Sequence, residues 1–385
     1  MTSAKISSYD QHGGGGINNQ KMALIGAVVH AFETGIPFAF PRISEMDQAN
    51  HNYEKYDYSV IFDDDPLKAV LKKYGITTVP FSADLDFDIS YENCFWKTFH
   101  LFAHSEFLKE DLKGQLVSDL IGAFVPRVLV TSSFRRLREA IHNRDGEVLF
   151  CQFRIENDWI VHCRNEIIKV RSASEELYVD YMKIGLKIAN TFPNIRNVFI
   201  CADEPSMPAS KEQIKLDLLQ KFGIRALFKT DFLGTSGDDF FRPNEHSLID
   251  MALCVDGTNF VGTTRSTFSN MVALQRYSAE AHKEPSYIYN HMSLRLKKRV
   301  DNGAAASVDQ AVPVSGKEIV IKDTHIAKLM ENGTEHPLLL REGASLSFED
   351  AVDYGEKIEL QKPLFDERLQ STGNVILDKS HIVML

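Results

Sequence analysis

The stretch GEVLFCQFRI, residues 146–155, is a continuous apolar run with β-branched and aromatic side chains. Such a run is typical of a strand that is covered on both faces, as in a parallel sheet. IRNVFICAD, residues 195–203, is a second run of this kind, and SKEQIKLDLLQKFG, residues 210–223, predicts an amphipathic helix that a glycine ends. Strand and helix alternate four times with short connections up to residue 280, which predicts a doubly wound parallel sheet.

Toward the N-terminus, the order strand, glycine turn, helix, strand predicts the start of another α/β unit. Four glycines, residues 13–16, precede NNQKMALIGAVVHAFETG, whose apolar residues recur at helical spacing until Gly35. IPFAFP, residues 36–41, is a short strand bounded by prolines. Further helices are predicted at residues 66–74, 108–125, 132–143 (with a serine cap) and 174–191.

The chain has 385 residues, more than a single-core domain usually has, so we expect two domains. The predicted fold is α/β, with Rossmann-like domains at residues 1–145 and 146–300 that face each other across a central cleft. Open α/β sheets bind ligands at the carboxyl ends of their strands, which would line that cleft. Residues 301–385 alternate less regularly and form a C-terminal extension that could complete or decorate either domain.

Composition narrows the range of partners. The net charge of -10 argues against nucleic acid or an anionic membrane surface as the main partner. No run of about 18 apolar residues predicts a membrane span, and the N-terminus lacks the pattern of a secretory signal. The cysteines stand singly with no CxxC pair, which predicts buried free thiols in a reducing, cytoplasmic setting. They are Cys94, Cys151, Cys163, Cys201 and Cys254.

The glycine run has two interpretations. It is a tight turn, or it is a loop that lets the backbone approach a phosphate or a sugar closely. It is not a Walker A loop, because no Gly-Lys-Ser/Thr follows. It is also a poor dinucleotide fingerprint, because Asn18 stands at the third small position, so an NAD enzyme is the weakest alternative.

Arg154 ends the first strand of the second half, beside Glu156, Asp158 and Trp159. A buried guanidinium needs a fixed anion, because an unpaired buried charge is very costly. Either Glu156 or Asp158 forms an internal salt bridge with Arg154, or the guanidinium forks onto a phosphate of a ligand.

The segment VGTTRSTFSNMVALQR, residues 261–276, places a run of hydroxyls before a helix. One hydroxyl would suffice for an N-cap, and a run of them favours an anion site at the helix N-terminus. Together with Arg154, this predicts a diphosphate held between an arginine and a helix start. The hydroxyl residues are Thr263, Thr264, Ser266 and Thr267.

No metal motif accompanies this site. Two acidic stretches could suggest a Mg²⁺ site, namely FDDDP, residues 62–66, and DLDFD, residues 84–88. We favour a solvated acidic helix start for FDDDP, and we do not assign a metal site to DLDFD either. A diphosphate bound without a metal points to transfer from a nucleotide sugar, where an arginine and a helix dipole neutralise the leaving group.

Three stretches then resemble, in order, motifs of the GDP-fucose-dependent fucosyltransferase superfamily, which includes protein O-fucosyltransferases and α1,6-fucosyltransferases. The resemblance implies a GT-B-like pair of Rossmann-like domains, with the first on the acceptor side, and an inverting, metal-independent transfer from GDP-fucose or a similar donor. It implies no further cofactor, and a glycan, lipid-linked saccharide or other hydroxyl as acceptor. The stretches are GGGGINNQKMALIGAVVHAFETGIPFAFPRI, LFCQFRIENDW and IDMALCVDGTNFVGTTRSTFSNMVALQR.

The same resemblance implies roles for individual residues. Arg154 would neutralise the β-phosphate of the departing GDP, and Asp250 would contact the guanine. Ser266, Thr267 and Phe268 would grip the diphosphate and pack the nucleoside, and the glycines would let the first domain close onto the sugar. The implied substrate-binding residues are Gly14, Gly15, Gly16, Asn18, Asn19, Gln152, Asp250, Ser266, Thr267 and Phe268.

The chain departs from the family pattern at two places. Gln152 replaces the histidine that precedes the family arginine, and glutamine does not titrate. The glycine loop holds no glutamate that could act as a base. A direct displacement then needs another carboxylate to remove the acceptor proton, and Glu156 and Asp158 are the candidates, one of which could instead orient Arg154. A strongly dissociative transfer would need only a weak base or none.

Two other functions stay open. One is a transferase that uses GDP-rhamnose or a UDP-sugar, against which Asp250 offers a partial argument, because a carboxylate pairs with the N1–H and N2–H₂ of guanine and poorly with uracil. The other is a non-catalytic module that binds a nucleotide sugar or a glycan, which the loss of the family histidine would fit.

Overall fold

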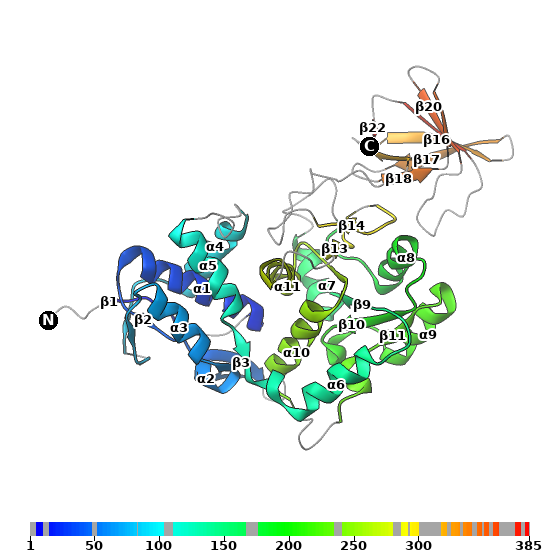
Figure 1. The fold of residues 1–385 in the computed structure, drawn as a ribbon. Helices are drawn as coiled ribbons and strands as arrows, with labels where there is room; N and C mark the ends of the chain where they lie inside the picture. The colour runs from blue at the N-terminus through cyan, green and yellow to red at the C-terminus, as the bar shows by residue number, and fades with distance from the viewer. Residues whose placement is uncertain are drawn as a thin grey trace.

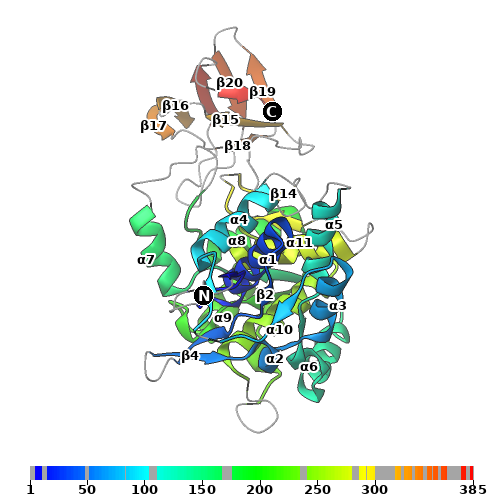
Figure 2. The same cartoon turned by 90° about the vertical axis from the view of Figure 1, so that its left-hand side faces the viewer.

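A computed structural model of the chain shows N-terminal helices with short strands, a central sheet with its helices, and a group of C-terminal strands at one end (Figures 1 and 2). None of the helices among the described residues is both long and apolar enough to cross a membrane. The structure describes residues 5–10, 15–47, 52–82, 84–103, 111–166, 176–234, 241–279, 286–291 and 293–299, and beyond these the strands of residues 317–384.

The centre of the fold is a six-stranded sheet in the order β11-β10-β9-β12-β13-β14. Its first five strands are parallel, and β14 runs antiparallel to β13. The predicted α/β class with a parallel sheet is therefore confirmed, and the arrangement in two domains stays a prediction. The strands are β9 (Val148–Gln152), β10 (Asn197–Cys201), β11 (Arg225–Leu227), β12 (Phe260–Gly262), β13 (Ser286–Ile288) and β14 (Lys297–Lys298).

Alternate residues of this sheet enter two different hydrophobic clusters, as the period of two of a β-strand requires. Phe150 and Phe199 belong to one cluster, and Leu149 and Val198 belong to the other. Both faces are thus covered, which explains why the interiors of β9 and β10 are apolar. Helices α8 (Tyr181–Thr191) and α9 (Lys211–Phe222) cover one face, and α10 (Pro243–Asp256) and α11 (Thr267–Ala279) lie between the other face and the N-terminal part (Figure 1).

The N-terminal part contains a small parallel arrangement of two-residue strands. β1 pairs with β7 and β2 pairs with β6, and a bridge between Ser7 and Phe38 joins the two pairs. The chain runs from β1 through α1 (Ile17–Thr34) to β2, which is the βαβ start that the sequence predicts. The strands are β1 (Lys5–Ile6), β2 (Phe38–Ala39), β6 (Thr78–Val79) and β7 (Asp86–Phe87).

Helix α1 lies at the centre of this part. Most of its residues are buried, which is typical of a helix that other elements surround. Gly35 ends it in a left-handed conformation (φ 71°), with its N–H bonded to the carbonyl oxygen of Ala31 at 2.8 Å. At Gly26, α4 (Tyr91–Ala103) comes so close that an added Cβ would lie 2.0 Å from the carbonyl oxygen of Cys94. The two helices therefore pack backbone against backbone at this point.

Several predicted boundaries need correction, because a capping side chain sets the start of each helix. Thr131, rather than a serine, caps α6 (Ser132–His142). Asp180 caps α8, which begins seven residues after the predicted start at 174. Three helices were not predicted at all, namely α2 (Tyr58–Ile61), α4 and α7 (Asn157–Glu166). The remaining α-helices and strands before residue 300 are α3 (Asp65–Lys73), α5 (Leu112–Gly122), β3 (Ile43–Asp47), β4 (Asn52–Tyr56), β5 (Phe62–Asp63) and β8 (Val125–Pro126).

The described segments of residues 301–385 are all strands. They form two antiparallel sheets, in the orders β18-β15-β22 and β17-β16-β21-β20-β19. The described part of the predicted extension is therefore β-structure. Its strands are β15 (Lys317–Ile321), β16 (His325–Glu331), β17 (Thr334–Leu340), β18 (Ser345–Phe348), β19 (Asp350–Asp353), β20 (Lys357–Gln361), β21 (Asn374–Asp378) and β22 (Ile382–Met384).

Replacement of Gly26 tests the contact between α1 and α4. We expect Gly26→Ala to lower the free energy of unfolding by about 1–3 kcal/mol, because the methyl group would overlap a backbone oxygen that cannot move alone. Gly122→Ala is the matched control, since an added Cβ there meets nothing within 4 Å. Urea unfolding of both variants is the measurement, and equal stability of the two would contradict the packing described.

Candidate functional site

The order of the central sheet reverses between β9 and β12. The chain adds β10 and β11 on one side of β9, and β12 and β13 on the other side. In open α/β sheets, ligands bind outside the carboxyl ends of the strands at such a reversal. Arg154 follows β9 and Thr263 follows β12, so two of the predicted ligand-binding stretches lie at neighbouring strand ends.

Gln152 ties these two strand ends together. Its Oε1 accepts a hydrogen bond from the Ser269 hydroxyl at 2.5 Å, and the Ser269 oxygen accepts one from the backbone N–H of Thr263 at 3.0 Å. Helix α11 approaches β12 closely here, because a Cβ at Gly262 would lie 2.2 Å from the Ser269 oxygen. Gln152 is buried and acts as a link in this frame.

Arg154 is held by both neighbouring carboxylates. Its Nη1 donates to Glu156 Oε2 at 2.8 Å, and its Nη1 and Nη2 fork onto Asp158 at 3.1 and 2.8 Å. The guanidinium carbon lies 5.1 Å from the centre of the Trp159 ring, within reach of a cation–π contact. The structure thus shows the internal salt bridge, one of the two interpretations, and the contact with a phosphate stays a prediction.

The two carboxylates differ in exposure. The Glu156 side chain is 5% exposed, and its second oxygen, Oε1, accepts from the backbone N–H of Asp203 at 3.1 Å. The Asp158 side chain, in the first turn of α7, is 68% exposed. Burial alone would raise the pKa of Asp158, but the hydrogen bonds and charge of Arg154 outweigh it and lower the pKa. Glu156 therefore fixes Arg154 from inside, and Asp158 is the carboxylate that a substrate can reach.

The start of α11 meets the start of α1. The Thr267 hydroxyl donates to Asn19 Oδ1 at 2.5 Å, so the glycine turn and the hydroxyl run lie side by side. Ser266 and Phe268, on either side of Thr267, are buried. Neither helix carries an acidic residue in its first turn, so two positive helix ends approach each other here.

Within the glycine turn, Gly15 has a structural requirement of its own. Its φ of +142° strains other residues, and an added Cβ would lie 2.8 Å from the Tyr91 hydroxyl. Gly16 is the N-cap of α1, makes no side-chain cap and has open space around it. Asn18 is 5% exposed, and its Oδ1 has no hydrogen-bond partner among the described residues. Gly14 lies outside the described residues, so the turn explains Gly15, and its contact with a ligand stays a prediction.

Asp250 lies on α10 and is 4% exposed. Its Oδ2 accepts from Lys229 Nζ at 2.7 Å, and its Oδ1 has no hydrogen-bond partner in the described part of the chain. Lys229 also donates to the carbonyl oxygen of Ala202, just after β10, at 3.0 Å. Burial raises the pKa of Asp250, and Lys229 opposes that shift. The sequence analysis missed Lys229, whose one signal was its position as the last residue of IRALFK, residues 224–229, which the sequence predicts as a strand.

Two further residues of this edge were also missed, and both follow β13. The Tyr289 hydroxyl accepts from the backbone N–H of Arg154 at 3.1 Å. Asn290 accepts from the N–H of Thr264 at 3.2 Å and donates to the hydroxyl of Thr264 at 2.8 Å. Strand β13 has only three residues, too few to register as a pattern, and its parallel pairing with β12 brings these side chains to the site.

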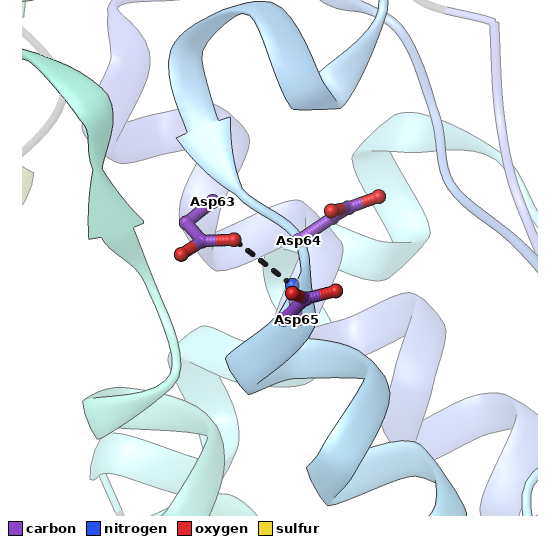
Figure 3. A group of neighbouring side chains, drawn as sticks. All are labelled: Asp63, Asp64 and Asp65. Atoms are coloured by element: carbon purple, nitrogen blue, oxygen red, sulfur yellow. Dashed lines mark hydrogen bonds between the residues drawn. The ribbon is translucent and has the colours of Figure 1, made fainter.

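The acidic triplet Asp63, Asp64 and Asp65 could bring one oxygen each within 4.8 Å of the others (Figure 3). Asp63 accepts from the backbone N–H of Asp65 at 3.2 Å, and Asp64 pairs with Lys68 at 2.6 Å. The triplet lies at the start of α3, where carboxylates oppose the helix dipole. This position and these contacts fit the interpretation as an acidic helix start.

No protein-family model and no curated protein matches the chain. Among solved structures, the chain is similar to POFUT1 in complex with GDP, at 13% identity and a TM-score of 0.47 over 74% of this chain and 98% of that one. It is similar to an Arabidopsis thaliana FUT1 mutant in complex with GDP, at 11% identity and a TM-score of 0.37 over 74% and 70%. It is also similar to the fucosyltransferase NodZ from Bradyrhizobium, at 11% identity and a TM-score of 0.38 over 71% and 94%. The function is therefore inferred from the side chains of this chain.

Lys21, next to the glycine turn, is a buried cation that the sequence analysis did not single out. It is 2% exposed, and its Nζ lies 3.4 Å from the sulfur of Met251 on α10 and 5.3 Å from the centre of the Phe124 ring. Neither neighbour is an anion. Burial lowers the pKa of Lys21 to about 7.

The pKa of Lys21 predicts a pH-dependent stability. Between its folded value of about 7 and its ordinary value of 10.5, the unfolded chain binds the proton and the folded chain does not, so this lysine makes stability rise with pH. We expect Lys21→Met to reduce that rise and to stabilise the fold most below the window. Denaturant unfolding across this pH range is the measurement, with exposed Lys72→Met as control. An unchanged pH dependence in Lys21→Met would contradict the burial of Lys21 without a counter-ion among the described residues.

Proposed function

We propose that the chain is an inverting glycosyltransferase that works without a metal ion. The proposed donor is GDP-fucose, and the proposed acceptor is a hydroxyl of a glycan or lipid-linked saccharide. The observation that carries the proposal is the position of Arg154 and the start of α11 at neighbouring strand ends where the sheet order reverses. A guanidinium and a helix N-terminus suit a diphosphate. The POFUT1 structures that the chain is similar to include complexes with GDP and with GDP-fucose.

In the proposed reaction, the acceptor oxygen bonds to the anomeric carbon of the sugar while the bond from that carbon to the β-phosphate oxygen breaks. GDP leaves, and the acceptor proton goes to a carboxylate. Arg154 and the N-terminus of α11 stabilise the charge that develops on the diphosphate. Asp158 is the base in this proposal, because its side chain is 68% exposed, whereas Glu156 is buried with its oxygens on Arg154 and the N–H of Asp203.

The salt bridge of Arg154 couples these two roles. The fork that now binds Asp158 has the geometry that binds a phosphate. A diphosphate that takes this fork displaces Asp158, which frees the exposed carboxylate to accept a proton. Donor binding would thus prepare the base.

The nucleobase of the donor is proposed to be guanine. Asp250 Oδ1 is a buried acceptor without a hydrogen-bond partner in the described part of the chain, and guanine offers N1–H and N2–H₂ donors that uracil lacks. GDP-rhamnose would make the same contact as GDP-fucose, so Asp250 selects the nucleobase of the donor and not its sugar.

Substitution of Arg154 tests the main role. We expect Arg154→Ala and Arg154→Lys to lower turnover of GDP-fucose by several orders of magnitude, because lysine cannot fork onto a phosphate. The measurement is release of GDP in the presence and absence of a hydroxyl acceptor, with circular dichroism to show that the fold persists. Near-full activity of Arg154→Lys would contradict the assignment.

Paired amide substitutions separate the two carboxylates. Asp158→Asn should lower kcat by about two to four orders of magnitude through loss of the base, while GDP binding stays equal or tightens because a competitor for Arg154 is gone. Glu156→Gln should mainly weaken GDP binding, because Arg154 loses its inner support. Calorimetry with GDP and steady-state kinetics distinguish the two. If Glu156→Gln abolished turnover and Asp158→Asn did not, Glu156 would be the base and Asp158 the support of Arg154, which would contradict the proposal.

A further inference from the structure

Lys187, on α8, lies behind the edge of the sheet that carries the candidate site. Its side chain is 0% exposed, which is rare for a lysine and costly unless the charge is compensated. Its Nζ donates to the carbonyl oxygens of Tyr289 at 2.8 Å and His291 at 2.5 Å, and it pairs with Glu176 at 3.3 Å. An ammonium has three protons, so these three acceptors satisfy it completely.

The carbonyls that Lys187 binds belong to the turn that leaves β13. The carbonyl between them, that of Asn290, accepts from the backbone N–H of Glu176 at 2.7 Å. Lys187 and the N–H of Glu176 therefore hold three consecutive carbonyls. Residues 289–291 are buried, so their carbonyl oxygens need hydrogen-bond donors within the protein in place of bulk water.

The side chains of Tyr289 and Asn290 contact the site. The Tyr289 hydroxyl binds the N–H of Arg154, and Asn290 binds both the N–H and the hydroxyl of Thr264. The turn thus contacts the residue after β9 that carries the guanidinium and the hydroxyl run after β12. A displacement of its backbone would move both contacts together.

We propose that Lys187 is a positioning residue, which holds the Tyr289–Asn290 turn so that Arg154 and Thr264 present a preformed site for the diphosphate of a nucleotide sugar. A lysine suits this task because one group supplies three donors to acceptors that diverge from a single point. The link to the diphosphate rests on the proposed function, and the positioning itself does not.

Hydrogen exchange with mass spectrometry tests the positioning without any ligand. The variant is Lys187→Met, and the control is Lys183→Met, because Lys183 also pairs with Glu176 at 2.8 Å but makes no described contact with the β13 turn. In Lys187→Met we expect peptides that hold the amides of Arg154 and Thr264 to exchange about tenfold faster or more, with β10 unchanged. Lys183→Met should match the wild type.

Uniformly faster exchange that includes β10, or no change at Arg154 and Thr264, would overturn the proposal, since either marks a merely structural lysine. If Lys187→Met does not fold, Lys187→Gln replaces it, because glutamine is polar but shorter and supplies two donors where the ammonium supplies three. Faster exchange at the same two amides would then support the proposal, and unchanged exchange would refute it.

Titration with GDP adds the functional link. We expect Lys187→Met to weaken GDP binding about tenfold while Lys183→Met leaves it unchanged, as loss of a preformed site raises the cost of ordering it. Absence of GDP binding in the wild type would refute the proposed function alone. Faster local exchange with unchanged GDP affinity would refute the link between Lys187 and the diphosphate.

Discussion

The reversal of strand order between β9 and β12 is the constraint on which the candidate site depends. Because both strands are parallel and adjacent, their carboxyl ends open at the same edge, and the chain leaves them in opposite directions. That geometry alone brings Arg154 and Thr263, more than a hundred positions apart in the sequence, to neighbouring strand ends. Ser269 then fixes the distance between them through Gln152 and the N–H of Thr263. The apolar runs that form the buried strands therefore also determine where the polar residues that follow them lie.

A second set of polar contacts joins the glycine turn, through β3, to the start of α10. Gln20 of α1 donates to the carbonyl oxygens of Gly15 and Ser44 and accepts from the N–H of Ser44. Ser44 and Glu45 of β3 in turn bind Asn244 at the start of α10. Buried networks of this kind demand that every partner be in place, so they specify one arrangement. The orientation of α1 against α10 follows from it.

The sequence predicted the elements whose pattern is local and missed those whose partners are distant. The interiors of β9 and β10 are apolar because helices cover both faces of the sheet, and Gly35 and Gly223 end their helices as predicted. Helix α4 was missed because its buried side faces another helix while Trp96 stays exposed on its other side, so no apolar stripe stands out. Lys21, Lys187 and Lys229 read as ordinary surface lysines in the sequence. Only the fold shows that each is buried, and with which partner.

The central claim is that the reversal point binds a guanosine diphosphate without a metal. Its most direct test is isothermal titration of the wild-type chain with GDP and with UDP, each in the presence and absence of EDTA. The account predicts tight binding of GDP, much weaker binding of UDP, and no effect of EDTA on either. Preference for UDP, or loss of GDP binding in EDTA, would contradict it and would direct attention to the acidic triplet at the start of α3.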